Sequence, residues 1–229
     1  MAHAVDFSDT KKTELRQMKG APISDRENAV SIYALKPKFQ ALLRPLTAAL
    51  ARGGVTANQV TLAAAVVSIA LGVFIASRAT ERWPFLLLPL WMFLRMALNA
   101  IDGMLAREFG QKSRLGAYLN ELTDVVSDSA LYLPFAFLPP FSPLWTGIVI
   151  VLAVLSEFAG VLGPAVGASR RYDGPMGKSD RAFVFGALGL WAGLGYVLPE
   201  WLAWIMPLLA PLIAVTIVNR VRHGLREGH

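Results

Sequence analysis

Carboxylate and amide side chains gather at the ends of two neighbouring apolar segments. Asn99 and Asp102 are three residues apart, and Asn120, Asp124 and Asp128 follow one another at intervals of four. Spacings of three and four place side chains on one face of a helix. Because acidic groups in apolar segments are costly and usually functional, the two faces are expected to meet in one cluster of oxygen donors. Such a cluster favours a hard divalent cation, Mg²⁺ or Mn²⁺.

Composition excludes the other common metal and thiol chemistries. The chain has no cysteine, which removes thiol nucleophiles, disulfides, iron–sulfur clusters and cysteine-bound zinc. Its three histidines are His3, His223 and His229, all near the termini, so no histidine-built metal site is expected. A bound metal would therefore rest on oxygen ligands.

The acidic residues also have a second interpretation. Asp124 and Asp128 could pair with Arg95 or Arg107 and only tie the helices together. This alternative is less favoured because no comparable number of basic residues lies within the apolar segments. Glu157, inside a further apolar segment, is expected either to support the cluster or to form a hydrogen bond between helices.

The segments that carry these residues are long enough to cross a membrane. Of the 229 residues, 55% are hydrophobic and only 17% are charged, whereas about a quarter are charged in soluble domains. A helix needs about 20 apolar residues to cross the hydrocarbon core, and a proline-rich turn at 139–143 divides one overlong run. The sequence therefore predicts an all-α polytopic membrane protein with six transmembrane helices, over about residues 53–77, 83–101, 117–138, 144–167, 182–199 and 201–219.

Lysine and arginine residues indicate the orientation of these spans. They concentrate in residues 1–58, 103–117, 168–182 and the C-terminal tail, whereas the opposite side has only Arg78 and Arg82. The positive-inside rule then places both termini in the cytoplasm. It also accounts for the net charge of +6, so no nucleic-acid partner is expected.

The N-terminal part of the chain divides in two. Residues 1–35 are polar and predict a cytoplasmic extension, and the membrane domain is expected over residues 36–229. Within it, residues 38–52 place leucine and phenylalanine at helical spacing among basic residues, which favours an amphipathic helix in the membrane interface. A soluble helix packed on the cytoplasmic loops is the alternative.

The order of the polar residues resembles the signature of the CDP-alcohol phosphotransferase family, D-x2-D-G-x2-A-R, then about eight residues, then G-x3-D-x3-D. The chain departs from this signature at Asn99 and Asn120, where the family has its first and third aspartates. The resemblance extends over about residues 36–220. The matching positions are Asp102, Gly103, Ala106, Arg107, Gly116 and Asp124.

This resemblance implies a membrane transferase of phospholipid biosynthesis. Such an enzyme moves a phosphatidyl group from a CDP-linked lipid, such as CDP-diacylglycerol, to an alcohol and releases CMP, while Mg²⁺ or Mn²⁺ offsets the charge that develops. The resemblance also implies a homodimer, and the bacterial inner membrane is the expected location. A transporter and a lipid-binding scaffold are the competing classes.

The resemblance also implies roles for individual residues. Asp124 is either a metal ligand or the general base that deprotonates the acceptor hydroxyl, and Asp128 is the second catalytic candidate. The metal is expected on Asn99, Asp102, Asn120 and Asp124. The nucleotide is expected against Asp102, Gly103, Ala106, Arg107 and Gly116.

The loop before the fifth predicted span is expected to bind the acceptor alcohol. The family tends to place acceptor-binding bases there, although the positive-inside rule alone would also account for them. The four bases are Arg170, Arg171, Lys178 and Arg181.

The two asparagines leave three outcomes open, because a neutral amide holds a second cation less well than a carboxylate does. Asp128 could join the site and restore part of the charge. The site could instead hold one metal tightly and receive a second with the nucleotide. In the third outcome the chain is a weak or inactive enzyme that binds CDP-linked lipid, and a working, divergent enzyme is the favoured reading.

Overall fold

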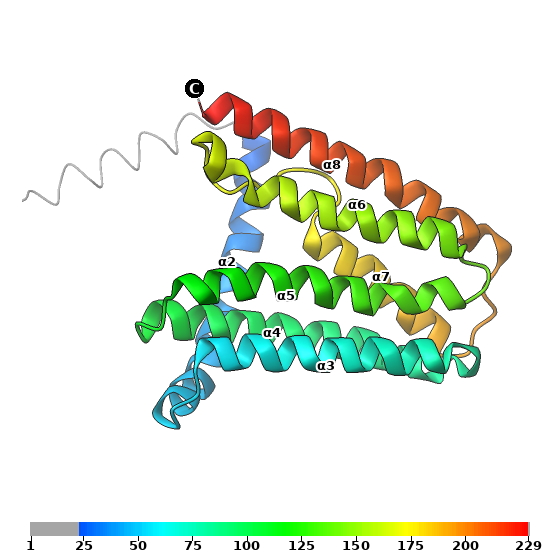
Figure 1. Cartoon of the computed structure of the whole chain (residues 1–229), viewed down its shortest axis with the longest axis horizontal. Helices are drawn as coiled ribbons and strands as arrows, with labels where there is room; N and C mark the ends of the chain where they lie inside the picture. Colours follow the sequence, from blue (N-terminus) through cyan, green and yellow to red (C-terminus); the bar gives the residue numbers. More distant parts are fainter. Residues whose placement is uncertain (1–22, 229) are drawn as a thin grey trace, which may run out of the picture.

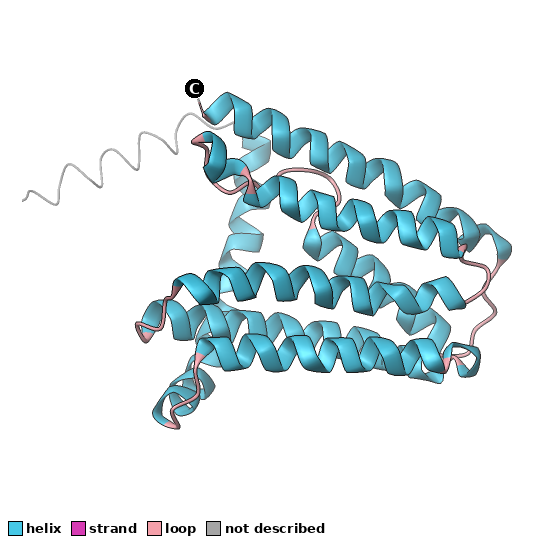
Figure 2. Cartoon of the chain, viewed as in Figure 1, coloured by secondary structure: helices cyan, strands magenta, loops and turns pink. Residues whose placement is uncertain are grey.

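The secondary structure is helical throughout the part of the chain that the structure describes. This computed structural model describes the backbone of residues 23–228 and the side chains of residues 37–228, and no strand occurs among them (Figure 2). The long helices are α2 (Ile23–Arg52), α3 (Ala57–Ser77), α4 (Leu87–Glu108), α5 (Arg114–Tyr132), α6 (Pro143–Val161), α7 (Lys178–Gly193) and α8 (Ile205–Glu227). Short 3₁₀ helices between them are η1 (Ala79–Glu81), η2 (Trp83–Leu86), η3 (Leu133–Phe137), η4 (Gly163–Val166) and η5 (Glu200–Trp204).

Helices α3 to α8 run up and down along the long axis of the molecule. The starts of α3, α5 and α7 lie at the same end of the bundle as the last turns of α4, α6 and α8, and α2 crosses that end (Figure 1). Helix α3 packs on α4 and α5, α6 packs on α8, and α7 packs on α4. The end of the bundle near α2 therefore collects the polar residues that the sequence singles out.

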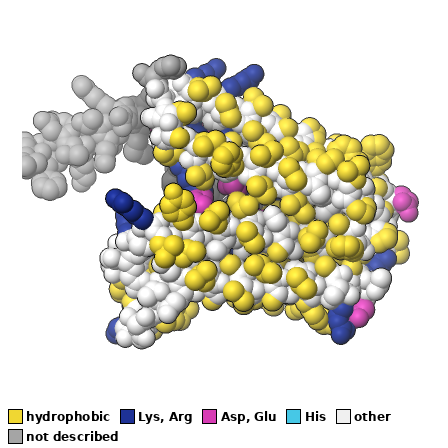
Figure 3. Space-filling model, viewed as in Figure 1, with side chains coloured by type: hydrophobic (Ala, Val, Ile, Leu, Met, Phe, Trp, Pro, Cys, Tyr) yellow, Lys and Arg dark blue, Asp and Glu magenta, His cyan; other side chains and the backbone are white. Residues whose placement is uncertain are grey.

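The membrane prediction is confirmed in its coarser form. Among the described residues, four helical segments are long and apolar enough to cross a membrane: Ala57–Ser77, Trp83–Glu108, Pro143–Val161 and Glu200–Glu227. Each of the six predicted spans coincides with one helix, but α5 carries several acidic residues and α7 is only 16 residues long. Hydrophobic side chains are spread along the length of the bundle on the face shown in Figure 3. The chain is an all-α integral membrane protein, and the count of six spans stays a prediction.

The helix predicted over residues 38–52 is the second half of the longer helix α2. Because α2 begins at Ile23, the predicted boundary between residues 35 and 36 falls inside a helix. Residues 1–22 of the predicted extension lie outside the described part of the chain. Helix α2 packs against α4 where it crosses the bundle.

Polar caps fix where two of the site helices begin. The Thr56 hydroxyl accepts a hydrogen bond from the Gln59 backbone N–H at 3.2 Å, and Gln59 Oε1 accepts one from the Thr56 N–H at 2.9 Å. This capping box starts α3. The Ser113 hydroxyl accepts from the Gly116 N–H at 2.9 Å and starts α5.

An aromatic cluster holds the opposite half of the bundle together. The rings of Tyr132 and Phe185 stack at 3.9 Å, and Phe135 meets Phe85 and Phe185 edge to face. These buried residues come from α5, α7, η2 and η3. The packing fixes α7 against the neighbouring helices, and α7 carries two of the predicted acceptor bases.

Gly72 allows α3 and α5 to approach closely. A β-carbon at this position would lie 2.2 Å from the carbonyl oxygen of Ala130, so Gly72→Ala must push the two helices apart. Overpacking of this kind costs about 1–3 kcal/mol, and we expect a lower midpoint of thermal unfolding in detergent. Gly147→Ala is the matched control because open space surrounds that position. Equal midpoints for the two variants would contradict this account of the packing.

Candidate functional site

A cavity of about 340 Å³ lies among α3, α4 and the start of α5, at the end of the bundle that α2 crosses. Its walls combine side chains from the end of α4 with others from the first turns of α3 and α5. The residues singled out from the sequence that line it are Asp102, Gly103, Ala106, Arg107, Gly116 and Asn120. The structure therefore brings all five predicted nucleotide-binding positions to one cavity, together with two predicted metal positions, Asp102, which belongs to both sets, and Asn120.

Two glycines of the cavity wall leave space that neighbouring side chains occupy. A β-carbon at Gly103 would lie 2.9 Å from a guanidinium nitrogen of Arg107, and one at Gly116 would lie 2.7 Å from Asn58 Oδ1. The absence of side chains leaves room for the Arg107 guanidinium and the Asn58 amide. It also lets a ligand approach the backbone of α4 and α5.

Two polar residues that the sequence analysis did not single out complete the cavity. The Thr61 hydroxyl donates to Asp102 Oδ2 at 2.8 Å, and Gln111 Oε1 accepts from the Ala57 N–H at 2.7 Å. Gln111 thereby ties the loop between α4 and α5 to the start of α3. Thr61, one turn after Ala57 in an otherwise apolar span, could have been found as a hydroxyl on the inner face of the helix.

Asp102 is buried, at 6% exposure, and forms no ion pair with any residue that the structure describes. The Thr61 hydroxyl satisfies one of its oxygens. A buried carboxylate without a basic partner is costly unless a cation binds it. Asp102 is therefore the carboxylate of the cavity that is available to a ligand or metal ion.

Asp124 is in the opposite electrostatic situation. Lys178 Nζ lies 2.5 Å from Asp124 Oδ2, and Arg95 Nη2 lies 2.9 Å from Asp124 Oδ1. The Asn99 amide donates to the same Oδ1 at 3.3 Å. Two basic side chains thus already neutralise Asp124.

Asp128 forms a buried ion pair with Arg95. The pairing of Asp124 and Asp128 with Arg95, which the second interpretation of the acids required, is therefore present. The expectation that few basic residues lie in the apolar segments is wrong, because Arg181 and Arg220 are fully buried near the ends of α7 and α8.

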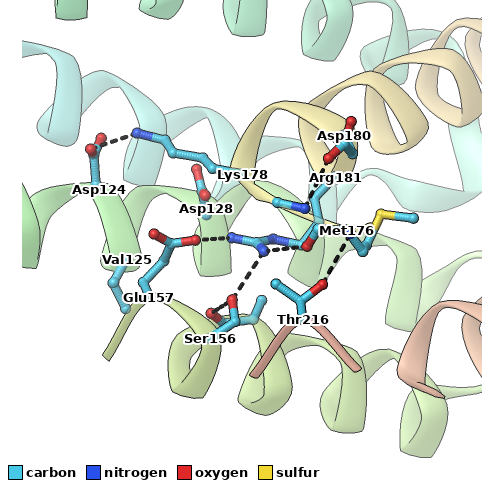
Figure 4. A network of polar contacts seen from close by, with 12 residues as sticks. Asp124, Val125, Asp128, Ser156, Glu157, Met176, Lys178, Asp180, Arg181 and Thr216 are labelled. Atoms are coloured by element: carbon cyan, nitrogen blue, oxygen red, sulfur yellow. Dashed lines mark hydrogen bonds and ion pairs between the residues drawn. The ribbon is translucent and has the colours of Figure 1, made fainter. Parts of the chain in front are cut away.

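Glu157 joins three helices through these buried arginines. Arg181 Nη2 lies 2.8 Å from Glu157 Oε1 (Figure 4). Arg220 Nη1 lies 3.3 Å from the same oxygen. Arg181 also donates to the Ser156 hydroxyl at 3.1 Å and to the Met176 carbonyl at 3.0 Å. Of the two roles expected for Glu157, the structure shows the bond between helices.

The four predicted acceptor bases lie in different surroundings. Arg170 pairs with Glu121 on α5 and stacks over the Tyr172 ring at 4.9 Å. Lys178 faces Asp124, as described above. Both therefore adjoin the polar face of α5. Arg181 has no exposed surface in this structure, and its two terminal guanidinium nitrogens donate to Ser156, Met176 and Glu157 as described above.

Arg171 instead fastens its loop to the last turns of α8. It contacts Asp173 at 2.9 and 3.0 Å and also pairs with Glu227. His223 Nδ1 lies 2.9 Å from Asp173 Oδ1. The hydrogen bonds from Arg171 lower the pKa of Asp173 to about 2, which favours the charged carboxylate at neutral pH.

The donor set fits one hard divalent cation. No group of three or more His, Cys, Asp or Glu side chains within the described residues is arranged to hold a metal ion. Oxygen donors are nevertheless present in the Asp102 carboxylate and in the amides of Asn99 and Asn120. Amide and carboxylate oxygens are ligands that Mg²⁺ and Mn²⁺ accept, with water completing the shell.

Comparison of the sequence with known families gives one match over most of the chain. The model described as CDP-alcohol phosphatidyltransferase matches residues 54–218. The chain is 45% identical over 199 residues to the inner membrane protein YnbA of Escherichia coli, covering 86% of this chain and 97% of that protein. It is 25% identical over 207 residues to a phosphatidylinositol phosphate synthase of Streptomyces avermitilis, covering 83% and 80% of the two chains.

Comparison with solved structures finds the same fold. The crystal structure of Mycobacterium tuberculosis phosphatidylinositol phosphate synthase with CDP-DAG bound matches with a TM-score of 0.66 at 22% identity, over 79% of this chain and 92% of that one. A crystal structure of the same synthase in complex with manganese and citrate matches with a TM-score of 0.65 at 23% identity, over 80% and 88%.

Proposed function

Because the chain belongs to the CDP-alcohol phosphatidyltransferase family, we propose that it transfers a phosphatidyl or related substituted phosphate group from a CDP-linked lipid to an alcohol. CDP-diacylglycerol is the proposed donor and CMP the released product. The observation that carries this proposal is the single cavity that Asp102, Gly103, Ala106, Arg107 and Gly116 line together. In the related mycobacterial synthase, a crystal structure contains bound CDP-DAG.

The proposed reaction is a displacement at phosphorus. The acceptor oxygen bonds to the lipid-linked phosphorus of the donor, the bond from that phosphorus to the bridging oxygen breaks, and CMP leaves with that oxygen. Arg107 would donate charge-assisted hydrogen bonds to the phosphates. Gly103 and Gly116 would let the nucleotide lie against the helix backbone.

The divalent cation would rest on Asp102, with Asn99, Asn120 and Asp124 as the other proposed ligands. When bound, Mg²⁺ or Mn²⁺ neutralises the pyrophosphate and the charge that develops during transfer. The complex of the mycobacterial synthase with manganese supports this choice of ions.

Asp124 is the proposed acceptor of the proton from the alcohol. Its side chain is 19% exposed, whereas that of Asp128 is 8% exposed and pairs with Arg95. We assign Asp128 the task of holding Arg95, and through it Asp124, in position. The catalytic role expected for Asp128 thus becomes an indirect one in this proposal.

Arg170 and Lys178 are the proposed acceptor-binding bases because they adjoin the polar face of α5. Arg171 and Arg181 would act indirectly, since their guanidinium groups hold the loop before α7 to α8 and α6. Two basic groups beside the site favour an acceptor that carries a phosphate or another anionic group.

The membrane arrangement is proposed from the same features. Helices α5 and α7 would complete six spans, because their polar side chains pair inside the bundle and need not face lipid. Helix α2, which crosses one end of the bundle, would lie at the interface, with both termini in the cytoplasm of a bacterium. The E. coli relative is named as an inner membrane protein, and we propose a homodimer in that membrane.

The test is CMP release by purified protein in detergent. CDP-diacylglycerol, Mn²⁺ or Mg²⁺ and a pool of small alcohols, including inositol phosphate and glycerol 3-phosphate, are mixed with the chain. We expect release that depends on metal, protein and acceptor. Retained CDP-diacylglycerol binding without release from any acceptor would instead favour the second candidate, a CDP-lipid-binding protein, which the two asparagines of the motif support.

A further inference from the structure

The two carboxylates of the motif differ in the charges that surround them. Lys178 and Arg95 contact opposite oxygens of Asp124 at 2.5 and 2.9 Å, and Figure 4 shows the Lys178 side chain extending from the start of α7 to Asp124. Asp102 has only the Thr61 hydroxyl as a side-chain partner in the described part of the chain. Basic side chains of the protein therefore neutralise Asp124, but none of them neutralises Asp102.

The polar interior is balanced before any metal ion is added. The interior contains four acidic and four basic side chains, so their formal charges sum to zero. Three of the acids contact these bases, and the fourth, Asp102, is offset by the one remaining positive charge. A second divalent cation would add two further positive charges, and Asn99 and Asn120 offer it only neutral oxygens. The acids are Asp102, Asp124, Asp128 and Glu157, and the bases are Arg95, Lys178, Arg181 and Arg220.

We infer that Lys178 supplies, as a fixed ammonium group, the positive charge that a second divalent cation would otherwise bring to Asp124, and that the site holds one divalent cation, at Asp102. The inference rests on the proposed function of this cavity. Lys178 is well held for such a role, because it is the first residue of α7 and Arg171 fastens the preceding loop to α8. Because the Lys178 ammonium group is already in place, no second cation has to bind before the transfer step.

The first measurement is the number of Mn²⁺ ions bound per chain. Electron paramagnetic resonance monitors this binding in titrations with and without CMP. We expect one ion per wild-type chain in both titrations. The triple variant Asn99→Asp, Asn120→Asp, Lys178→Met gains two carboxylates and loses the ammonium, so we expect it to bind two ions with the spectrum of a coupled pair. Two ions on the wild-type chain, or one on the triple variant, would overturn the inference.

The second measurement is the rate of CMP release. Removal of one fixed charge from a buried site costs on the order of a hundredfold in rate, so we expect Lys178→Met to lose about that much while still binding one Mn²⁺. Lys178→Arg keeps the charge and is expected to stay within about tenfold of wild type. Lys38→Met, at an exposed lysine of α2, is the matched control and should change neither quantity. Wild-type rates in Lys178→Met would also overturn the inference.

The two proposals can fail separately. If no acceptor gives CMP release but the Mn²⁺ counts are one and two as expected, the proposed function is rejected and the role of Lys178 stands. If CMP is released and the wild-type chain binds two Mn²⁺ ions, the function stands and the role of Lys178 is rejected. Should Lys178→Met fail to fold, the counts on the wild-type chain and on Lys178→Arg decide, with one ion expected on each and two ions contradicting the inference.

Discussion

Asp102→Asn is expected to reduce CMP release by on the order of a thousandfold, which corresponds to about 4 kcal/mol of lost transition-state stabilisation. Asp102 is the carboxylate of the cavity without a basic partner among the described residues, and its replacement leaves the cation with neutral ligands only on that side. The fold should be retained, because an asparagine oxygen can still accept the hydrogen bond from Thr61. Release of CMP from CDP-diacylglycerol and the Kd for Mn²⁺ are the two quantities to measure.

The control for Asp102→Asn is Glu108→Gln on the same helix. Glu108 lies at the end of α4 and forms an exposed pair with Arg44 at 3.0 Å, an arrangement that contributes little to stability. We expect this variant to release CMP at the wild-type rate and to bind Mn²⁺ unchanged. Full activity in Asp102→Asn would reject the assignment of the cavity as the active site.

Glu157→Ala is expected to lower the free energy of unfolding by about 3–5 kcal/mol, because removal of one partner leaves buried charges uncompensated. Both Arg181 and Arg220 contact the same oxygen of Glu157, and both are almost completely buried. Their positive charges would then face each other without an acid between them. Unfolding of the purified protein by a graded denaturing detergent, followed by circular dichroism, measures the loss.

Two further variants test the origin of this loss. Glu157→Gln keeps the hydrogen-bond acceptor and removes the charge, so its stability should fall between that of wild type and that of Glu157→Ala. Glu200→Ala removes an exposed carboxylate at the start of η5 and should leave the unfolding curve unchanged. If Glu157→Ala unfolds at the same detergent fraction as Glu200→Ala, the network does not stabilise the bundle.

Residue spacing along the chain predicted features that belong to a single helix, such as its position in the sequence and the side chains on one of its faces. The apolar runs predicted the positions of α3 to α8 to within a few residues at most ends, because a span needs a fixed number of apolar residues. The interval of three between Asn99 and Asp102 is a property of α4 alone. These two side chains therefore lie on one side of the helix in any packing of the bundle.

Ion-pair partners could not be predicted in the same way. Asp124 and Lys178 are 54 residues apart in the chain, and Glu157 and Arg220 are 63 residues apart. Their contacts depend on how α7 and α8 pack and on where their first and last turns lie. Arg181 is expected from the resemblance to bind the acceptor, and Arg220 is counted in the basic C-terminal tail, because charge and spacing alone do not show that both side chains are buried in the bundle.

The sequence by itself determined the helical membrane architecture, the residues of the motif and the chemistry that they favour, because each of these follows from composition and local periodicity. Only the tertiary structure decided which carboxylate remains available to a cation. Asp102 and Asp124 have the same side chain and belong to the same motif, but Lys178 and Arg95 neutralise Asp124 and not Asp102. The physical reason is that electrostatic energy depends on distances of a few ångströms between charges, and packing of distant segments sets those distances.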